Sequence, residues 1–493
     1  MPHHNHMMPR PAFHFTPQRN WMNDPNGLVH HGGLWHLFYQ YNPQGPDWGN
    51  MSWGHATSTD LQHWREHPVA LPYRDGEQIY SGSIVATQGE PQLTAFYTSA
   101  FSNGRQAQSK ATSSDGGFSW EQDPQNPVLD RGTNAFRDPK VIRHTDADGT
   151  EMWVLLAVEA DDRQVHFYSS TDLCRWEHRS SFGPLELQGS GQGSGQLVWE
   201  CPDLIPLPVD GDPENLRWVL LVSTNPVGED ADPEGSSMSY VIGDFDGTGF
   251  TTESTELTRL DHGRDFYAGV TFDNAPANQK IMLGWMSNWA YAGAIPSDPW
   301  RGAMSLPRLL SLRTVGGVLR LVQQPPEFIH AQLDAAPARR FEMTQPTEVT
   351  LSGHSLLELH WDPATTGTLR LALAGEADAS VDIEHSPATG ALRITRHGAA
   401  VEAVHATFPS TNTVALPPSA PVRLLLSLDG PLMELFINDG AATASNLVVL
   451  GAGAVTARLD SDLPGCVSIT TIDVPTGDNI AAVSPASSAT ALV

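Results

Sequence analysis

The pattern of apolar and polar positions differs between the two parts of the chain. In the last third, residues 369–385 (LRLALAGEADASVDIEH) and 422–439 (VRLLLSLDGPLMELFIND) alternate small or branched apolar residues with polar ones. Period-two alternation with Asp-Gly and Gly-Pro turns is typical of antiparallel strands that bury one face. We therefore predict a β-sandwich over residues 341–485, preceded by a proline-containing linker at 326–340.

The first part of the chain is rich in aromatic residues, since 13 of the 14 tryptophans lie between Trp21 and Trp300. It also contains a weak repeat, with STDLQHW at 58–64, SSDGGFSW at 113–120, STDLCRW at 170–176 and a looser copy, GDFDGTGF, at 243–250. Serine and aspartate side chains can hold a tight turn, while the tryptophan packs between neighbouring sheets. The spacing predicts an all-β fold in which residues 10–325 form a five-bladed β-propeller.

Charge and composition narrow the class of function. The net charge of −28 argues against partners with phosphate backbones and against anionic membrane surfaces. Three cysteines, Cys174, Cys201 and Cys466, are too few for a disulfide framework and lack zinc-ligand spacing. The histidine-rich start is not expected to bind metal, although it includes His3, His4 and His6. The first residues also lack the apolar core of a signal peptide, which predicts a cytoplasmic protein, or a secreted one whose signal has been removed.

Three acidic residues stand in similar local settings. Asp24 lies in WMNDPNG (21–27), Asp138 in FRDPK (136–140), and Glu200 in ECPD (200–203). A proline soon after each acid favours extended backbone, which can hold a carboxylate in place. In a propeller, such segments would converge on one axial cavity. Paired carboxylates are what glycosidic hydrolysis requires, one to protonate the leaving oxygen and one to attack carbon or activate water. Spacing alone leaves this a hypothesis, because the chain has 56 acidic residues and most are expected to be solvated.

The three motifs, in this order, resemble the signatures of glycoside hydrolase family 32, which contains invertases, exo-inulinases, levanases and related fructosyltransferases. Further segments extend the resemblance over most of residues 13–323, among them FYQYNP (38–43), YSGS (80–83), DFYAGVTF (265–272) and GWMSNW (284–289). It is weaker beyond, where LSLDGPLMELFINDG lacks the Arg-Ser-Ser that is usual in the family after the aspartate.

The resemblance implies a five-bladed propeller followed by a β-sandwich. It makes Asp24 the nucleophile, Glu200 the acid/base and Asp138 the stabiliser of the transition state. The implied fructose subsite contains Asn23, Gln40, Trp48, Ser81, Arg137 and Asp265, with Trp53 and Trp289 as walls. Cys201 is interpreted as a small buried neighbour of the acid/base. We expect no metal and no organic cofactor, because carboxylates perform all the covalent and proton-transfer steps.

The predicted activity is that of a retaining exo-acting β-fructosidase acting on sucrose, inulin or levan. One alternative is a fructosyltransferase or an endo-acting fructanase with the same site. A second is a non-catalytic fructan-binding protein, and a third is an inverting arabinan- or xylan-cleaving hydrolase on the same architecture. The expected partners are sucrose or fructan, with no nucleic acid and no membrane, and the protein is expected to be a monomer or a homodimer.

Overall fold

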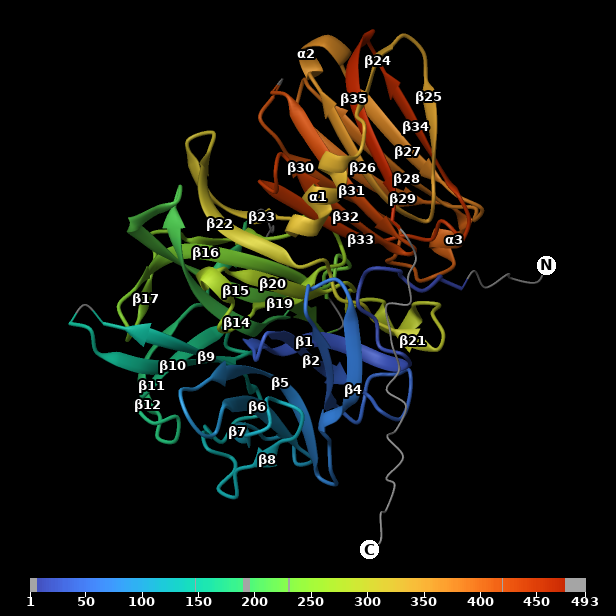
Figure 1. Cartoon of the computed structure of the whole chain (residues 1–493). Helices are drawn as coiled ribbons and strands as arrows, with labels where there is room; N and C mark the ends of the chain where they lie inside the picture. Colours follow the sequence, from blue (N-terminus) through green and yellow to red (C-terminus); the bar gives the residue numbers. More distant parts are fainter. Residues whose placement is uncertain (1–6, 147, 189–195, 229–230, 419, 475–493) are drawn as a thin grey trace, which may run out of the picture.

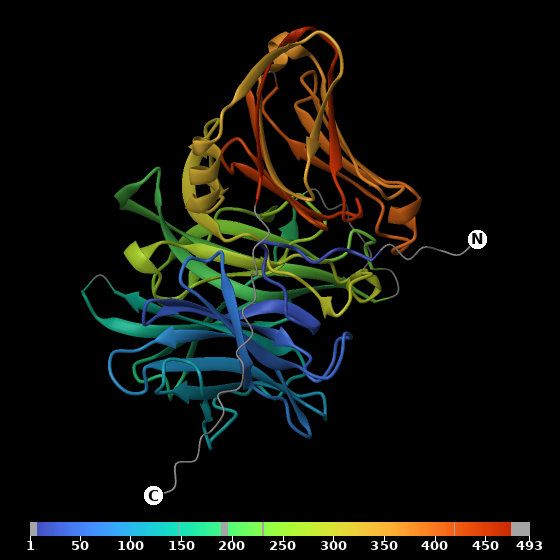
Figure 2. The same cartoon turned by 45° about the vertical axis from the view of Figure 1, so that its right-hand side comes forward.

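The computed structural model describes residues 7–146, 148–188, 196–228, 231–418 and 420–474. Strands dominate these residues and form two domains, one above the other in Figure 1. The lower domain ends with β23 (Val318–Gln324), and helix α1 (Glu327–Ala335) connects it to the upper one. Figure 2 shows α1 at the side of the boundary between the domains. The all-β class is confirmed, whereas the exact division at 326–340 stays a prediction.

Within the described residues, the lower domain contains five groups of four antiparallel strands, and the fourth and fifth groups join into one sheet through a parallel pairing. Each group runs outward from one strand near the centre. The groups are β1 (Asn20–His31), β2 (Leu34–Tyr41), β3 (Ser52–Ser58) and β4 (Trp64–Leu71); β5 (Glu77–Ala86), β6 (Leu93–Phe101), β7 (Gln106–Ser113) and β8 (Glu121–Gln122); β9 (Phe136–Thr145), β10 (Glu151–Glu159), β11 (Gln164–Ser170) and β12 (Glu177–Phe182); β14 (Gln196–Val209), β15 (Asp212–Val227), β16 (Ser237–Phe245) and β18 (Glu256–Arg259); and β19 (Tyr267–Thr271), β20 (Ile281–Trp285), β22 (Arg308–Val315) and β23.

The five innermost strands close a ring. β1 packs against β5, β5 against β9, β9 against β14, β14 against β19, and β19 again against β1. The short strand β21 (Trp300–Arg301) pairs with the start of β1, and the short strands β13 (Glu186–Leu187) and β17 (Phe250–Thr251) lie at the outer edge of the fourth group. The ring is that of a five-bladed propeller, as the repeat predicted, and it places five strands from distant parts of the sequence around one axis.

Each of these innermost strands carries an extra residue relative to its partner strand at one point near the axis, and β1 carries a second one between Asn26 and Val29. Such a β-bulge bends the strand and changes the direction of a side chain. The register shifts fall between Met22 and Pro25 in β1, between Tyr80 and Gly82 in β5, between Arg137 and Lys140 in β9, between Glu200 and Asp203 in β14, and between Tyr267 and Val270 in β19.

The repeated Ser-x-Asp segments form the turn between the third and fourth strands of a blade. In the first blade, Asp60 accepts hydrogen bonds from the Gln62 and His63 amides, and Ser58 donates to it. Asp115 and Asp172 hold the equivalent turns of the next two blades in the same way. The tryptophans that follow cross to the neighbouring blade, since Trp120 packs edge-on against Phe38 and Trp176 against Phe96.

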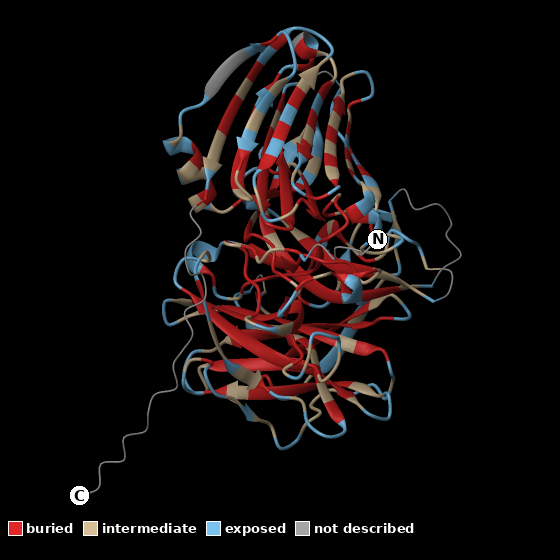
Figure 3. Ribbon diagram, turned by 90° about the vertical axis from the view of Figure 1, so that its right-hand side faces the viewer, coloured by how far each residue is buried: buried red, intermediate tan, exposed pale blue. Residues whose placement is uncertain are grey.

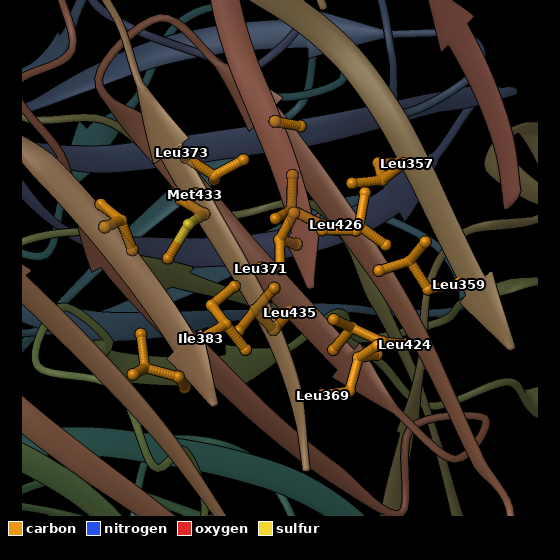
Figure 4. Close-up of a cluster of buried hydrophobic side chains, with 14 of the residues drawn as sticks. Leu357, Leu359, Leu369, Leu371, Leu373, Ile383, Leu424, Leu426, Met433 and Leu435 are labelled. Atoms are coloured by element: carbon orange, nitrogen blue, oxygen red, sulfur yellow. The ribbon is translucent and has the colours of Figure 1, made fainter. Parts of the chain in front are cut away.

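The upper domain is a sandwich of two six-stranded antiparallel sheets with a leucine-rich core between them (Figure 4). Buried side chains alternate along the strands of residues 369–385, as the period-two pattern predicted, whereas the strands within residues 422–439 are buried on both faces. Two short helices, α2 (Pro363–Thr366) and α3 (Ala399–Glu402), lie in its loops. The sheets are formed by β24 (Arg339–Met343), β35 (Gly465–Asp473), β26 (His354–Trp361), β31 (Val422–Asp429), β32 (Leu432–Ile437) and β33 (Ala442–Leu447), and by β25 (Thr347–Leu351), β34 (Val455–Ser461), β27 (Leu369–Ala374), β28 (Ser380–Ser386), β29 (Ala391–His397) and β30 (Ser410–Ala415).

The boundary between the domains is buried and rich in charge. Figure 3 shows buried residues continuing from the propeller into the sandwich. The guanidinium of Arg308 reaches Asp261 in the propeller at 2.9 Å and Glu434 in the sandwich at 2.6 Å. His14, on the segment that precedes β1, lies between Glu434 and Asp429 of the sandwich. Because buried charges persist only when they are paired, this interface holds the domains in one arrangement.

Candidate active site

Asp24 lies on the bulge of β1 and is nearly buried. Its Oδ2 accepts a hydrogen bond from the Ser81 hydroxyl at 2.7 Å, and its Oδ1 accepts one from the Asn23 amide at 3.0 Å. Burial raises the pKa of Asp24 and the negative charge of Glu200 raises it further, while the two hydrogen bonds act in the opposite direction. The hydrogen bonds favour the ionised carboxylate that a nucleophile requires.

Asp138 lies on the bulge of β9 with φ 62°, a left-handed backbone that is unusual for a residue other than glycine. Its amide donates to the Thr98 hydroxyl at 2.8 Å, and its Oδ2 accepts from the Cys201 amide at 2.9 Å. Burial raises the pKa of Asp138 to about 7; the nearby Arg137 opposes this rise and Glu200 adds to it. Asp138 is therefore able to keep a proton close to neutral pH.

Glu200 stands beside the bulge of β14, and its side chain is 20% exposed. Its Oε1 accepts a hydrogen bond from Arg137 Nε at 3.1 Å and forms an ion pair with Arg137 Nη2 at 3.0 Å. Its Oε2 accepts a hydrogen bond from the Tyr267 hydroxyl, which comes from β19. Glu200 is thus held by one residue from each of two other blades and remains open to solvent on part of its surface.

The three carboxyl groups share one small volume at the axis. The Cys201 sulfur lies 3.5 Å from Asp24 Oδ2 and 3.7 Å from Asp138 Oδ2. The negative charge of Glu200 raises the pKa of both Asp24 and Asp138, so the protonation of each aspartate depends on the charge of its neighbours. A coupled group of acids can hold a proton and a negative charge at the same pH, which is what acid catalysis together with nucleophilic attack demands.

The structure brings several of the predicted subsite residues to this group. Asn23, Ser81 and Arg137 each hydrogen-bond to one of the carboxylates. Gln40 lies behind them, where its side-chain N–H group reaches the Asn26 amide oxygen at 3.0 Å in the amide orientation that satisfies both residues. Asn26, whose role the sequence left open, thereby joins β1 to β2.

The three predicted tryptophans take different positions. Trp48 is 46% exposed, and its ring lies 6.0 Å from that of Tyr80. Trp289 is half-buried and stacks on Trp21 at 6.0 Å. Trp53 is fully buried and donates its indole N–H to the Tyr80 carbonyl at 3.0 Å, so it supports the site from beneath without offering surface to a ligand.

Asp265 is not brought to the carboxylates. It is completely buried at the boundary between the domains, where its Oδ1 accepts from the Tyr291 hydroxyl and its Oδ2 from Arg396 and the Leu447 amide. Both oxygens are therefore occupied by protein donors. A fully buried carboxylate with these partners has no surface with which to bind a sugar, and we leave it out of the subsite proposed below.

Two further residues belong to the site, although sequence reasoning gave them no role in catalysis. The Tyr267 hydroxyl donates to Glu200, and the pKa of this tyrosine is raised well above its ordinary value, first by burial and then by Glu200. Cys201 supplies a backbone N–H to Asp138, while burial and the nearby acids raise the pKa of its thiol. The thiol is accordingly neutral, as its interpretation as an unreactive neighbour requires. The one sequence feature that could have pointed to Tyr267 as a site residue is its place in the DFYAGVTF segment, which resembles the family.

Comparison with protein-family models decides the family. The model described as glycosyl hydrolases family 32 N-terminal domain matches residues 14–325, and the family 32 C-terminal model matches residues 327–460. The chain belongs to glycoside hydrolase family 32. This confirms the resemblance drawn from the three motifs, and it makes the protein a glycoside hydrolase.

Curated members of family 32 match along most of the chain. It is 35% identical over 463 residues to levanase of Bacillus subtilis (strain 168), covering 89% of this chain and 66% of that protein. It is 34% identical over 503 residues to an extracellular exo-inulinase of Aspergillus awamori, covering 92% and 91%. The chain thus spans about two thirds of the length of the levanase.

Solved structures of family 32 have the same fold. The exo-inulinase of Aspergillus awamori superimposes with a TM-score of 0.85 at 33% identity, covering 94% of this chain and 98% of the other. The β-fructofuranosidase of Schwanniomyces occidentalis, solved with fructosyl-erythritol, gives 0.82 at 29%, covering 94% and 97%. The propeller and the sandwich are therefore both shared.

Among the described residues, no group of three or more His, Cys, Asp or Glu side chains is arranged to hold a metal ion. No helix there is long and apolar enough to span a bilayer. Cys174, Cys201 and Cys466 are free thiols. His3, His4 and His6 lie outside the described residues.

Proposed function

We propose that this protein is an exo-acting retaining β-fructosidase that removes terminal β-D-fructofuranosyl units from sucrose, inulin or levan. The observation that carries the proposal is the convergence of Asp24, Asp138 and Glu200 at the bulges of three innermost strands, each with its own hydrogen-bond donors. Relatives named levanase, exo-inulinase and invertase support the choice of a fructosyl substrate.

In the first step, an Asp24 oxygen attacks the anomeric carbon of the terminal fructosyl unit. The bond from this carbon to the glycosidic oxygen breaks, and the departing oxygen takes the proton of Glu200. The product is a fructosyl ester of Asp24. Ser81 and Asn23 hold the attacking carboxylate in one orientation before the substrate arrives.

In the second step, Glu200 is ionised and removes a proton from a water molecule, whose oxygen attacks the anomeric carbon. The ester bond to Asp24 breaks, and fructose leaves with retained configuration. The Arg137 guanidinium and the Tyr267 hydroxyl stabilise the ionised Glu200 between the steps, because both donate to it.

Asp138 takes the third role. Among the described residues its Oδ2 accepts from the Cys201 amide, and no hydrogen bond occupies its Oδ1. That oxygen is available to sugar hydroxyls as positive charge develops on the ring. Asn23, Gln40, Ser81 and Arg137 complete the proposed fructose subsite, with Trp48 and Trp289 as its walls and Trp53 as a buried support.

The two steps need no metal and no organic cofactor, so we propose that the enzyme acts without one. We further propose residues 10–325 as the catalytic domain and residues 341–485 as the sandwich, joined by 326–340; residues 475–485 lie outside the described range. Because the relative from Aspergillus awamori is named extracellular, we propose secretion over a cytoplasmic location. Detection of activity in culture medium rather than in cell extract tests this location.

The function is tested by incubating the purified protein separately with sucrose, inulin and levan, and by resolving the products over time. Free fructose from the start, without intermediate oligomers, is expected, and the relative rates identify the preferred linkage. Short oligosaccharides that accumulate first would instead indicate endo-cleavage or transfer to another sugar. The matched control is Asp24→Asn, and a wild type as inactive as this control would leave only the binding-protein alternative.

A further inference from the structure

Arg396, in strand β29 of the sandwich, is 2% exposed and makes contacts on both sides of the domain boundary. Its Nη1 donates to Asp265 Oδ2 at 2.8 Å, and its Nη2 donates to the Tyr291 hydroxyl at 2.7 Å. Tyr291 in turn donates to Asp265 Oδ1 at 2.7 Å. These three side chains form a closed, buried triangle in which one sandwich residue binds two propeller residues.

Asp265, the first of these propeller residues, is linked to Glu200 through Tyr267. Asp265 precedes Tyr267 by two positions, and the Tyr267 hydroxyl donates to Glu200 Oε2. Asp265 is held in addition by the backbone of β33, since its amide donates to the Ser445 carbonyl and its Oδ2 accepts from the Leu447 amide. The backbone that carries Tyr267 is therefore anchored at its start by the sandwich.

Tyr291, the second of these propeller residues, is linked to Asp24 through Trp289. Tyr291 follows Trp289 by two positions, and Trp289 stacks on Trp21. The Trp21 indole donates to Asn23 Oδ1 at 2.7 Å, and the Asn23 amide donates to Asp24 Oδ1. From the same guanidinium, contacts and one short backbone segment, residues 289–291, thus lead to the proposed nucleophile.

We propose that Arg396 is a positioning residue for the active site, acting through Asp265 on Tyr267 and Glu200, and through Tyr291 on Trp289 and Asp24. The sandwich thereby sets the geometry of both carboxylates, although it contributes no group to the reaction. A planar guanidinium suits this position because its fork reaches two acceptors at fixed angles. The inference rests on the proposed fructosidase function and adds to it a requirement for the second domain.

The test compares full-length Arg396→Met with the unchanged protein on sucrose, measuring kcat, KM, the pH dependence of kcat/KM and the midpoint of thermal unfolding. A small misplacement of catalytic groups lowers kcat strongly, so a loss of about ten-fold or more in kcat is expected, with little change in KM. The pH dependence of kcat/KM is expected to change as well, because a displaced Tyr267 hydroxyl weakens its hydrogen bond to the reacting carboxyl group of Glu200.

The matched control is His14→Gln. His14 is also fully buried between the domains and paired with acids of the sandwich, but its partners Asp429 and Glu434 belong to neither series of contacts. His14→Gln is expected to lower the unfolding midpoint while keeping the kcat and pH profile of the unchanged protein. If both variants lose activity alike, the effect is a general weakening of the interface and the proposal is wrong.

A double-mutant cycle tests the route through Tyr267. If Arg396 acts through this tyrosine, Tyr267→Phe and Arg396→Met together cost less than the product of their separate effects. Multiplicative effects would contradict that route. Should Arg396→Met fail to fold, Asp265→Asn removes the same ion pair with almost no change in volume and is expected to shift kcat and pH profile in the same way.

Different results would contradict the proposed function and the proposed role of Arg396. An unchanged protein that releases no fructose from sucrose, inulin or levan defeats the proposed function. An active unchanged protein, together with an Arg396→Met variant of normal kcat and normal pH profile, defeats only the inference about the sandwich.

Discussion

Arg137 donates a hydrogen bond from Nε to Glu200 Oε1 at 3.1 Å, and its Nη2 forms an ion pair with the same oxygen at 3.0 Å, so that a residue of the third blade fixes the carboxyl group of the fourth. The same guanidinium lies 3.9 Å from Asp138 Oδ2. The positive charge of Arg137 therefore acts on two of the three acids, Glu200 and Asp138. Because Arg137 is nearly buried, its effect on them is not screened by solvent as a surface pair would be.

Replacing Arg137 by Met is expected to lower kcat/KM by about 10²-fold, as loss of a buried charged donor commonly does. Arg137 holds the pKa of Asp138 down to about 7 against burial, so its removal raises that pKa further. The acid limb of the pH profile should then move to higher pH, since Asp138 stays protonated over a wider range. Arg137→Lys, which keeps the charge but not the fork, should shift the limb less. An acid limb that does not move in Arg137→Met would contradict this account.

Asp24→Asn is expected to reduce kcat by at least about 10⁴-fold, because an amide cannot form the fructosyl ester. The asparagine has almost the same volume and still meets Ser81 and Asn23, so the midpoint of thermal unfolding should change little. Mass spectrometry after rapid acid quench should detect a fructosyl adduct on the unchanged protein but not on Asp24→Asn. Residual turnover near the wild-type rate would remove Asp24 from the nucleophile role.

Glu200→Gln is expected to lower kcat for sucrose by about 10²–10⁴-fold, the usual contribution of a general acid/base. A fructosyl donor with a good leaving group needs no protonation, so its first step should be nearly normal in this variant. Added azide should then accelerate the second step, because it attacks without a base. A pH–rate profile that Glu200→Gln leaves unaltered would rule out the assignment.

Stability is expected to fall as pH rises above neutrality, because of His14. Burial alone would lower the pKa of His14, but hydrogen bonds to Asp429 and Glu434 outweigh this and raise it to about 9 from 6.5. The protonated histidine therefore contributes its full stabilisation below pH 6.5, and this is lost as pH rises through 9. A shift of this size corresponds to about 3 kcal/mol. Urea unfolding at several pH values should show the decline.

The control for that measurement is His14→Gln, which keeps a hydrogen-bonding side chain but has no proton to lose in this range. Its free energy of unfolding should be lower than that of the unchanged protein at slightly acidic pH and should depend less on pH up to 9. Equal pH dependence in the two proteins would show that the histidine does not control this transition.

The local sequence predicted a large part of the fold. The alternation of residues 369–385 and 422–439 predicted sandwich strands, and the Ser-x-Asp segments with their tryptophans predicted the turns and contacts of the blades. These features depend on residues that are close together in the sequence, so they can be predicted from residue type and order alone. The family motifs likewise predicted the family and the glycoside hydrolase class, and both are confirmed.

The sequence did not predict the positions that Asp265 and Tyr267 take in the folded chain. Asp265 was expected beside fructose but is buried against Arg396, and Tyr267, two positions later, reaches Glu200 instead. The bulges at the innermost strands change side-chain direction, and they are visible only when each strand is aligned with its partner. A pattern along one strand contains no such alignment.

The sequence by itself therefore determined the family and the kind of secondary structure that holds the three acids, because both follow from residue type and short-range spacing. Only the tertiary structure decided which of them meet. Asp24 and Cys201 are 177 positions apart and lie 3.5 Å from each other, because closure of the ring brings β1 and β14 to one axis. The pKa of each acid depends on that proximity and on burial, and both arise only when all five blades are in place.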